Sequence, residues 1–162
     1  MHSESSNQII IQTAKLEDIT TILSLSSLGF DYDFQFDQTL NMNWVNSSEA
    51  MNHYKKLITN HNSTIIIALS NSKAIGYLSA TVEMPEDYRK QFKIAEIIEL
   101  IVVEEFRSKN IGSRLISEFR TWAKQKNCER TRVQVSAQNE KAIRFYCKNH
   151  FEDYITILEG EI

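Results

Sequence analysis

Residues 102–115 read Val-Val-Glu-Glu-Phe-Arg-Ser-Lys-Asn-Ile-Gly-Ser-Arg-Leu and place a cationic turn between two apolar patterns. Before the turn, Ile94–Val103 is the longest strand-like run in the chain. After it, apolar residues recur at helical spacing over residues 111–126. The first turn of a helix offers unpaired N–H groups and the positive end of its dipole, so a phosphate site is predicted, to which Gly112 gives close access. An ordinary strand-to-helix turn explains the same residues.

A second motif follows downstream, Asn139-Glu-Lys-Ala142-Ile-Arg-Phe145-Tyr146. We expect a helix over residues 139–149, with Asn139 as its cap or as the partner of a nearby amide. Tyr146 lies seven residues later and therefore on the same helical face. Both side chains are expected to point into one cleft, although a tyrosine in this pattern, taken alone, is more often a half-buried core residue.

The rest of the chain alternates between strand-like and helix-like segments. Residues 29–44 lose the period and predict an irregular or short helical segment. A strand–helix–strand order implies a parallel pair, whereas the short polar link at residues 70–73 forces an antiparallel one. We expect a mixed sheet in a single α/β domain over residues 1–162. The expected strands are residues 7–13, 63–69, 74–82, 94–103, 131–135 and 154–158, and the expected helices are residues 15–28, 49–60, 111–126 and 139–149.

Together the two motifs resemble those of the GNAT acetyltransferase superfamily, in which an R/Q-x-x-G-x-G/A turn is followed by an N-x-x-A-x-x-F-Y helix. The first reads Arg107-Ser-Lys-Asn-Ile-Gly112 and the second Asn139-x-x-Ala-x-x-Phe-Tyr146. Two positions depart from the family pattern. Asn110 replaces the first glycine of the turn, and His150 replaces the glycine before Phe151. Asn and His are enriched among non-glycine residues with positive φ, so we expect left-handed backbone at both positions.

The resemblance implies a fold and a donor. The fold is a mixed, mostly antiparallel sheet of six to seven strands, with a splayed parallel pair and helices on both faces. The donor is acetyl-CoA, with its diphosphate at the turn and its pantetheine arm in the gap of the splayed pair. An amide near Val102 or Val103 is expected to stabilise the oxyanion, and Tyr146 to protonate the departing thiolate. The implied cofactor-binding residues are Leu100, Ile101, Val102, Val103, Arg107, Ser108, Lys109, Asn110, Ile111, Gly112, Ser113, Asn139, Ala142 and Tyr146.

The implied reaction moves an acetyl group to a primary amine of a small molecule or peptide. An alkylammonium cannot attack until it loses a proton, so a base is needed. Glu96 and Glu99 are the candidates, and three residues apart on a strand they face opposite sides unless a bulge intervenes. Glu99 is slightly favoured because it belongs to the family's E-L-x-V pattern. A solvated or cation-paired carboxylate explains each glutamate equally well.

A competing interpretation is a GNAT-fold module that has lost catalysis and only binds acyl-CoA or a partner. It is favoured by Asn110, whose side chain would crowd the phosphates, and by the choice left open between two bases. A nucleotide-binding P-loop is disfavoured because no Gly-Lys-Ser/Thr follows the turn.

The acceptor is predicted to bind near residues 30–44, where aromatic and acidic residues interleave. Phe30, Asp31, Tyr32 and Asp33 form the candidate substrate-binding set, and Asp37 extends the acidic character. Such a rim suits a cationic amine through charge and cation–π contact. An acidic solvated face over aromatic core residues is the simpler alternative.

The composition excludes several classes of protein. The formal net charge of −3 disfavours nucleic acid as a partner. Because the chain has no signal-peptide pattern and no run of 18 apolar residues, we expect a cytoplasmic protein without membrane contact. Cys128 and Cys147 are too few for a disulfide scaffold and have no metal-ligand spacing, so we expect reduced, packed thiols and no metal. A monomer or a homodimer is compatible with the sequence.

Overall fold

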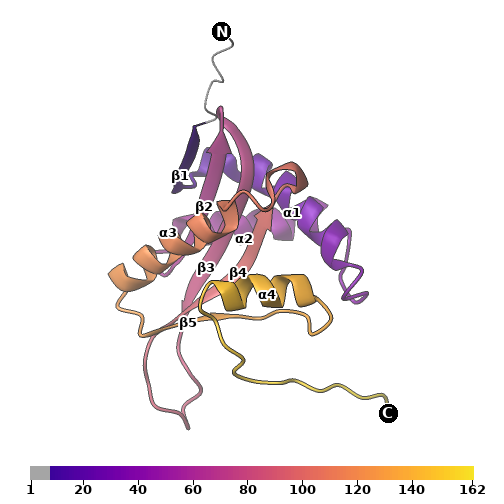
Figure 1. Ribbon diagram of the computed structural model, residues 1–162, viewed down its shortest axis with the longest axis vertical. Coiled ribbons are helices and arrows are strands. Elements are labelled where there is room, and N and C mark those ends of the chain that lie inside the picture. Colours follow the sequence, from indigo (N-terminus) through magenta and orange to yellow (C-terminus); the bar gives the residue numbers. More distant parts are fainter. Residues whose placement is uncertain (1–7) are drawn as a thin grey trace.

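The computed structural model describes residues 8–162 and contains one mixed sheet in the order β1-β2-β3-β4-β5 (Figure 1). The first four strands pair antiparallel, and β5 joins β4 in parallel. This arrangement confirms the α/β class and the parallel pair expected from the sequence. The strands are β1 (Ile9–Thr13), β2 (Ser63–Ser70), β3 (Lys73–Glu83), β4 (Ile94–Val102) and β5 (Arg130–Val133).

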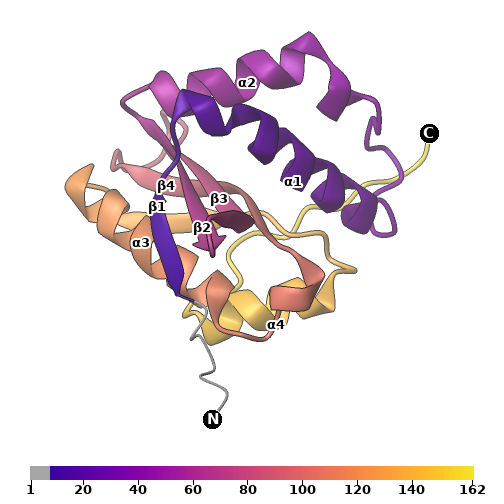
Figure 2. The ribbon, with the colours of Figure 1, turned by 90° about the horizontal axis from the view of Figure 1, so that it is seen from above.

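Helices cover both faces of the sheet, as Figure 2 shows, with α1 and α2 on one side and α3 and α4 on the other. Each face has its own apolar core, one built around Phe119 of α3 and the other around Ile22 of α1. No helix formed by residues 8–162 is long and apolar enough to span a bilayer. The α-helices are α1 (Ile19–Asp33), α2 (Ser48–Thr59), α3 (Ile111–Gln125) and α4 (Glu140–Lys148), and the short 3-10 helices are η1 (Leu16–Asp18), η2 (Trp44–Asn46) and η3 (Glu104–Phe106).

Helix α1 is longer than the sequence pattern predicted. It continues through Gly29 to Asp33, whereas an irregular or short helical segment was expected from residue 29 onward. A Cβ added at Gly29 would lie 2.5 Å from Cδ1 of Ile101, so the glycine allows the helix to pack closely on β4. Because α1 extends this far, Phe30, Tyr32 and Asp33 are held on a helix rather than in a loop.

The strand expected over residues 154–158 does not form. The chain beyond α4 pairs with no strand of the described sheet, which therefore has five strands rather than six or seven. Figure 1 shows this C-terminal segment running away from the edge at β5, so its β-branched residues have no neighbouring strand to pair with. Its apolar side chains are exposed, among them Ile157 and Leu158. The cysteine expectation also needs correction, because Cys147 is exposed whereas Cys128 is only partly buried; both are free thiols.

A bulge in β4 marks the place where the parallel pair separates. Ser79 of β3 lies opposite Glu99, but its neighbour Ala80 lies opposite Ile97, so Ile98 is an extra residue. Pairing of β4 with β5 stops at the same point, with Ile97 opposite Val133. The predicted splay therefore begins at the bulge, and residues 98–102 continue without β5 beside them.

Close contact between β3 and β4 beside this gap depends on Gly76. A Cβ at this position would lie 2.5 Å from the carbonyl oxygen of Ile101 and 3.2 Å from Cα of Val102. These backbone atoms cannot rotate out of the way as a side chain can. Gly76→Ala is therefore expected to lower the free energy of unfolding, measured in urea, by about 1–3 kcal/mol. Gly160→Ala is the control, because nothing lies within 4 Å of its Cβ position. Equal stability of the two variants would contradict this packing.

Candidate active site

The edge of β4 that faces the splay carries backbone groups that no neighbouring strand pairs with beyond Ile97. The Val103 amide donates to the Ile75 carbonyl at 2.9 Å, and Val102 lies opposite Gly76, which fixes the register. In an antiparallel ladder, alternate residues point their backbone groups to opposite edges. Those of Leu100 and Val102 therefore point away from β3 and into the splay, whereas the Val103 amide is already bonded.

The turn after β4 has the backbone conformation expected of its glycine-like position. Asn110, at the N-cap of α3, has a φ of 63° and ψ of 11°, and its side chain makes no capping hydrogen bond. Ser108 adds a second positive φ, of 59°. The first amide of α3 to bond back is that of Arg114, which donates to the Asn110 carbonyl at 3.1 Å. The amides of residues 111–113 are thus free of intrahelical partners and form a nest for an anion.

Gly112 has a packing role in addition to the phosphate access expected of it. A Cβ here would lie 2.8 Å from Cζ of Phe145 and 3.7 Å from Cδ2 of Leu100. The glycine therefore allows the Phe145 ring of α4 to lie against the start of α3. Close packing of two helices, rather than access for a phosphate alone, requires a residue without a side chain here.

Arg107 connects the turn to the end of α1. Its Nε donates to the Val102 carbonyl at 3.0 Å, and its guanidinium lies 4.8 Å from the centre of the Tyr32 ring. Partial burial raises the pKa of the Asp33 carboxyl, and the positive charge of Arg107 acts in the opposite direction. The proposed cofactor-binding turn and the proposed acceptor-binding residues are thus brought together.

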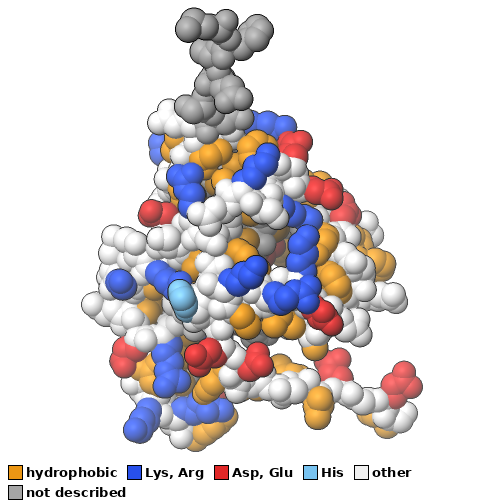
Figure 3. Space-filling model, viewed as in Figure 1, with side chains coloured by type: hydrophobic (Ala, Val, Ile, Leu, Met, Phe, Trp, Pro, Cys, Tyr) orange, Lys and Arg blue, Asp and Glu red, His pale blue; other side chains and the backbone are white. Residues whose placement is uncertain are grey.

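Lys and Arg side chains gather on the face that carries α3 and α4 (Figure 3). Exposed cations on the turn and the two helices include Lys109, Arg114, Lys141 and Arg144. Although the chain is acidic as a whole, this local positive charge favours an anionic ligand beside the free amides of α3.

Helix α4 places Tyr146 beside the same region. Its ring is 9% exposed and packs edge-on against Phe145 and Phe151, with ring centres 5.2 and 5.5 Å away. Burial, and secondly the negative charge of Asp33, raises the pKa of the Tyr146 phenol. A phenol of this kind stays protonated at neutral pH and is a potential proton donor.

Two further motif residues have structural partners within α4. The Asn139 side chain accepts a hydrogen bond from the Ala142 amide at 3.1 Å, which confirms its expected role as the helix cap. His150 ends the helix with a φ of 64°, as its glycine-like position predicted. Asn139 and His150 thus mark the start and the end of the helix that carries Tyr146.

The bulge at Ile98 gives Glu99 the same orientation as Glu96. Ala95 and Ile97 belong to the α3 core, so Glu96 between them faces the α1 and α2 side. Glu99 also faces that side, because its carboxylate accepts hydrogen bonds from hydroxyl groups of α1, α2 and β3. The two glutamates thus share one face, the outcome that the sequence left open to a bulge.

The two carboxylates differ in their partners. Glu96 forms an ion pair with Arg132 of β5 and accepts from the Gln134 side chain at 3.2 Å. Glu99 has no ion-pair partner among the described residues and is held by hydroxyl groups instead, while part of its surface stays accessible. Burial raises the pKa of Glu99, and hydrogen bonds from Tyr77 and Tyr54 oppose the rise. A carboxyl of this kind is suited to proton transfer nearer neutral pH than an exposed glutamate.

Phe30 and Trp44 belong to the predicted acceptor stretch, but sequence reasoning missed His53 and Tyr54 of α2, which border the same site. Phe30 stacks on Trp44 with ring centres 5.7 Å apart, and Trp44 also contacts the rings of His53 and Tyr54. Asp31 is exposed at the end of α1. His53 and Tyr54 carry no local motif, because only tertiary packing of α2 brings them to Glu99.

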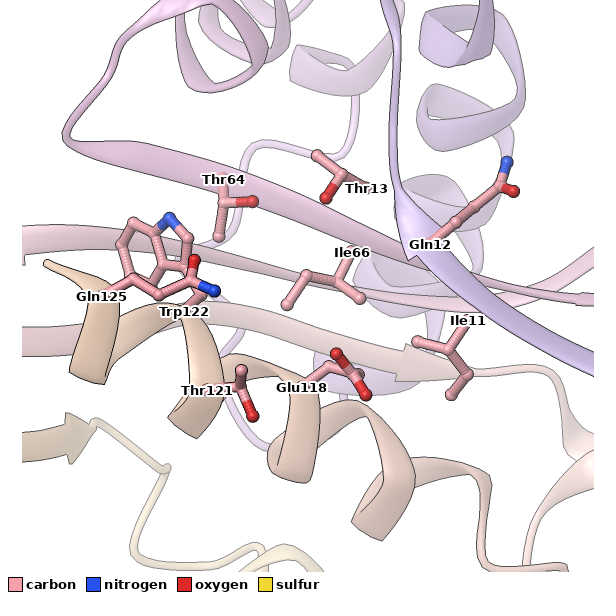
Figure 4. A pocket seen from close by; sticks show the side chains of 9 residues that line it. All are labelled: Ile11, Gln12, Thr13, Thr64, Ile66, Glu118, Thr121, Trp122 and Gln125. Carbon is pink, nitrogen blue, oxygen red and sulfur yellow. The ribbon is translucent and has the colours of Figure 1, made fainter.

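A separate groove lies between β1, β2 and α3, with a volume of about 210 Å³ (Figure 4). Its lining is mostly polar and includes Thr13, Thr64 and Glu118. The groove lies at the β1 end of the sheet, whereas β5 forms the other end. None of the predicted site residues lines it.

Comparison with known proteins identifies the family. A model described as the acetyltransferase (GNAT) family matches residues 31–151. The chain therefore belongs to the GNAT acetyltransferase family, and the N-acetyltransferase class expected from its motifs is confirmed.

Two curated relatives are N-acetyltransferases described as uncharacterized. One, from Archaeoglobus fulgidus, is 25% identical over 103 residues, which cover 64% of this chain and 69% of the relative. The other, from Bacillus subtilis, is 30% identical over 99 residues, which cover 61% and 65%. The matches to relatives from Methanocaldococcus jannaschii and Xenopus tropicalis span about half of those proteins, 44% and 48%.

Solved structures share the fold at low sequence identity. A mutant of the BH1408 protein from Bacillus halodurans has a TM-score of 0.85 and 16% identity, covering 94% of this chain and 99% of that one. The aminoglycoside 6'-N-acetyltransferase AAC(6')-Ih from Acinetobacter baumannii has a TM-score of 0.74 and 18% identity, covering 96% and 99%. The aminoglycoside N-acetyltransferase AAC(6')-Iy, solved with CoA, has a TM-score of 0.75 and 13% identity, covering 99% of both chains.

Proposed function

We propose that this protein transfers an acetyl group from acetyl-CoA to a primary amine of a small molecule or peptide. The observation that carries the proposal is the splay of β4 from β5, which begins at the bulge beside Glu99 and leads to the free amides of α3. The splay thus connects the proposed base Glu99, the edge of β4 that β5 does not pair with, and the anion-binding amides at the start of α3. A GNAT-family structure solved with CoA supports the choice of donor.

Residues of the turn and of β4 are proposed to hold the donor. The amides of Ile111, Gly112 and Ser113 would bind the diphosphate, and exposed Ser108 and Lys109 would contact its outer oxygens. Backbone groups of Leu100 would bind the pantetheine arm and the Val102 amide would meet its thioester end, with Ile101 and Val103 supporting this edge from the β3 side. Acetyl-CoA supplies the activated acetyl group, and the chain positions it.

Three groups are proposed to carry out the chemistry. Glu99 would take a proton from the acceptor ammonium, directly or through water, and free its lone pair for attack. The Val102 amide would donate to the thioester oxygen as negative charge develops there, because the Val103 amide is already bonded to Ile75. Tyr146 would then protonate the departing thiolate. In this scheme Glu96 has a structural role only, because it is held in an ion pair with Arg132.

The acceptor is proposed to enter over the end of α1, past Phe30, Asp31, Tyr32 and Asp33. Negative charge at this end of α1 attracts a cationic amine, and the aromatic rings offer cation–π contact. Family structures named as aminoglycoside acetyltransferases support a small-molecule amine.

Charge removal tests this acceptor site. The double variant with Asp31→Asn and Asp33→Asn is expected to raise the acceptor KM about two- to fivefold, the effect of an exposed charge pair, without changing the acetyl-CoA KM. Asp87→Asn, an exposed aspartate between β3 and β4, is the matched control. An acceptor KM equal to that of the wild type would reject the cationic rim.

The activity itself is tested by release of free thiol. Acetyl-CoA is incubated with a panel of polyamines, aminoglycosides, amino acids and peptide N-termini, and mass spectrometry of each acceptor checks for an added acetyl group. We expect at least one amine to be acetylated in step with thiol release. Binding of acetyl-CoA without thiol release for any acceptor would favour the binding module instead.

A further inference from the structure

The Glu99 carboxylate is enclosed by four hydroxyl groups from three elements, which we call the hydroxyl cage. Tyr77 donates at 2.8 Å and Tyr54 lies 3.0 Å from both carboxylate oxygens. Ser26 and Ser79 complete the cage at 3.3 and 3.4 Å. All four cage residues are fully buried, at 0% exposure. Four buried hydroxyl groups from α1, α2 and β3 thus converge on one carboxylate.

Within residues 8–162, the cage holds the Glu99 carboxylate without an ion-pair partner. Of the titratable groups near it, His53 of α2 contributes a positive field when protonated, and Glu96 on the same face of β4 is paired with Arg132 of β5. From α1 and β3 the cage receives only hydroxyl groups. Burial, and secondly the charge of Glu99, raises the pKa of both Tyr54 and Tyr77, so both remain donors at physiological pH.

We propose that Tyr54 and Tyr77 are positioning residues that hold the Glu99 carboxylate at the bulge and set how readily it takes and releases a proton. This inference rests on the proposed function only in naming Glu99 as the base. Neither tyrosine touches the reacting atoms; both act through Glu99. Residues of α2 and β3, outside every motif of the family pattern in this chain, would thus tune the reaction.

The geometry also explains how the cage accepts both forms of Glu99. The Tyr54 hydroxyl lies 2.6 Å from Oγ of Ser26 as well as 3.0 Å from the carboxylate. When Glu99 gains a proton, Tyr54 can turn its hydrogen toward Ser26 and present its own lone pair to the new carboxylic acid. No proton leaves Tyr54 in this step; the proton that Glu99 gains comes from the acceptor ammonium. The exchange needs only rotation about one C–O bond.

Removing a donor has a predictable sign. Hydrogen bonds to the charged form favour it, so their loss raises the pKa of Glu99 further. In Tyr54→Phe and in Tyr77→Phe, the acid limb of kcat/KM is expected to move to higher pH, with a rate about tenfold lower at the acid end. The rate should recover as pH rises, and the acetyl-CoA KM should not change. A merely structural role would lower the rate at every pH.

A direct titration separates this inference from the proposed activity. The protein is labelled with ¹³C at the glutamate carboxyl, the Glu99 signal is assigned by its loss in Glu99→Gln, and its midpoint is followed by NMR. The midpoint is expected to lie at higher pH in Tyr54→Phe and in Tyr77→Phe than in the wild type. It should be unchanged in Tyr88→Phe, the control, because Tyr88 is 80% exposed and belongs to the connection between β3 and β4 rather than to the cage.

Equal midpoints in the wild type and both cage variants would overturn the inference. If loss of a tyrosine hydroxyl prevents folding, Ser26→Ala removes the 3.3 Å donor with both rings in place, and the same upward shift is expected. A shifted midpoint without acetylation of any amine would refute the proposed function and keep the cage. Acetylation together with an unchanged midpoint would support the proposed function and refute the role of the cage.

Discussion

Glu99→Gln is expected to slow acetyl transfer roughly 100- to 10,000-fold, the usual contribution of a general base. Glutamine keeps the size of the side chain and an oxygen for the hydroxyl cage but cannot take a proton from the acceptor. Affinity for acetyl-CoA should not change, because Glu99 faces α1 and α2 rather than the turn. Thiol release at saturating donor, with calorimetry of donor binding, measures both quantities.

Glu96→Gln is the matched control for the base. Glu96 lies on the same face of β4 but is held by Arg132 and Gln134, so its replacement is expected to cost far less turnover. A large loss in Glu96→Gln together with a retained rate in Glu99→Gln would exchange their roles.

Stability gives a second readout for Glu99 with a defined sign. Because burial raises the pKa of Glu99 in the folded protein, the unfolded chain loses this proton first as pH rises. The free energy of unfolding should therefore fall from the ordinary glutamate pKa up to the folded one, and this component should be absent in Glu99→Gln. Urea unfolding across that pH window compares the two proteins. Parallel curves would contradict burial as the cause.

Tyr146→Phe is expected to lower turnover about 100-fold or more while leaving the affinity for acetyl-CoA unchanged. The thiolate then leaves without its proton donor. Phenylalanine preserves the ring contacts with Phe145 and Phe151, so the variant should fold. The measurement is kcat at saturating donor and acceptor.

The controls for Tyr146 separate chemistry from packing. Tyr32→Phe removes a hydroxyl near the same region but keeps the ring beneath Arg107, so a smaller effect is expected. A turnover for Tyr146→Phe equal to that of the wild type would remove Tyr146 from the mechanism.

Local sequence signals predicted the parts of the fold that depend on local chemistry. Positive φ at Asn110 and His150 followed from the glycine positions that they replace. The start of α2 after Ser47 was also predictable, and the Ser47 side chain accepts from the Ala50 amide at 3.1 Å. Each is decided within a few residues of chain.

Features that depend on distant contacts could not be predicted. The bulge at Ile98 is visible only in the register of β4 against β3, yet it decides that both glutamates share one face. The packing roles of Gly29 and Gly112 could not be predicted either, because their neighbours Ile101 and Phe145 come from other elements. The hydroxyl cage likewise joins three elements that no single motif connects.

At residues 154–158 the sequence predicted a strand that the structure does not contain. The composition of this segment favours a strand, but a strand also needs a neighbouring edge at the right distance, and this segment leaves α4 away from β5. Propensity alone therefore overcounted the strands of the sheet.

A crystal structure of the protein with acetyl-CoA tests the central claim most directly. We expect the diphosphate on the amides of residues 111–113, the pantetheine arm along Leu100 and Val102, and the thioester oxygen within hydrogen-bond distance of the Val102 amide. A donor bound elsewhere, for example in the groove between β1 and α3 with the splay empty, would contradict the account.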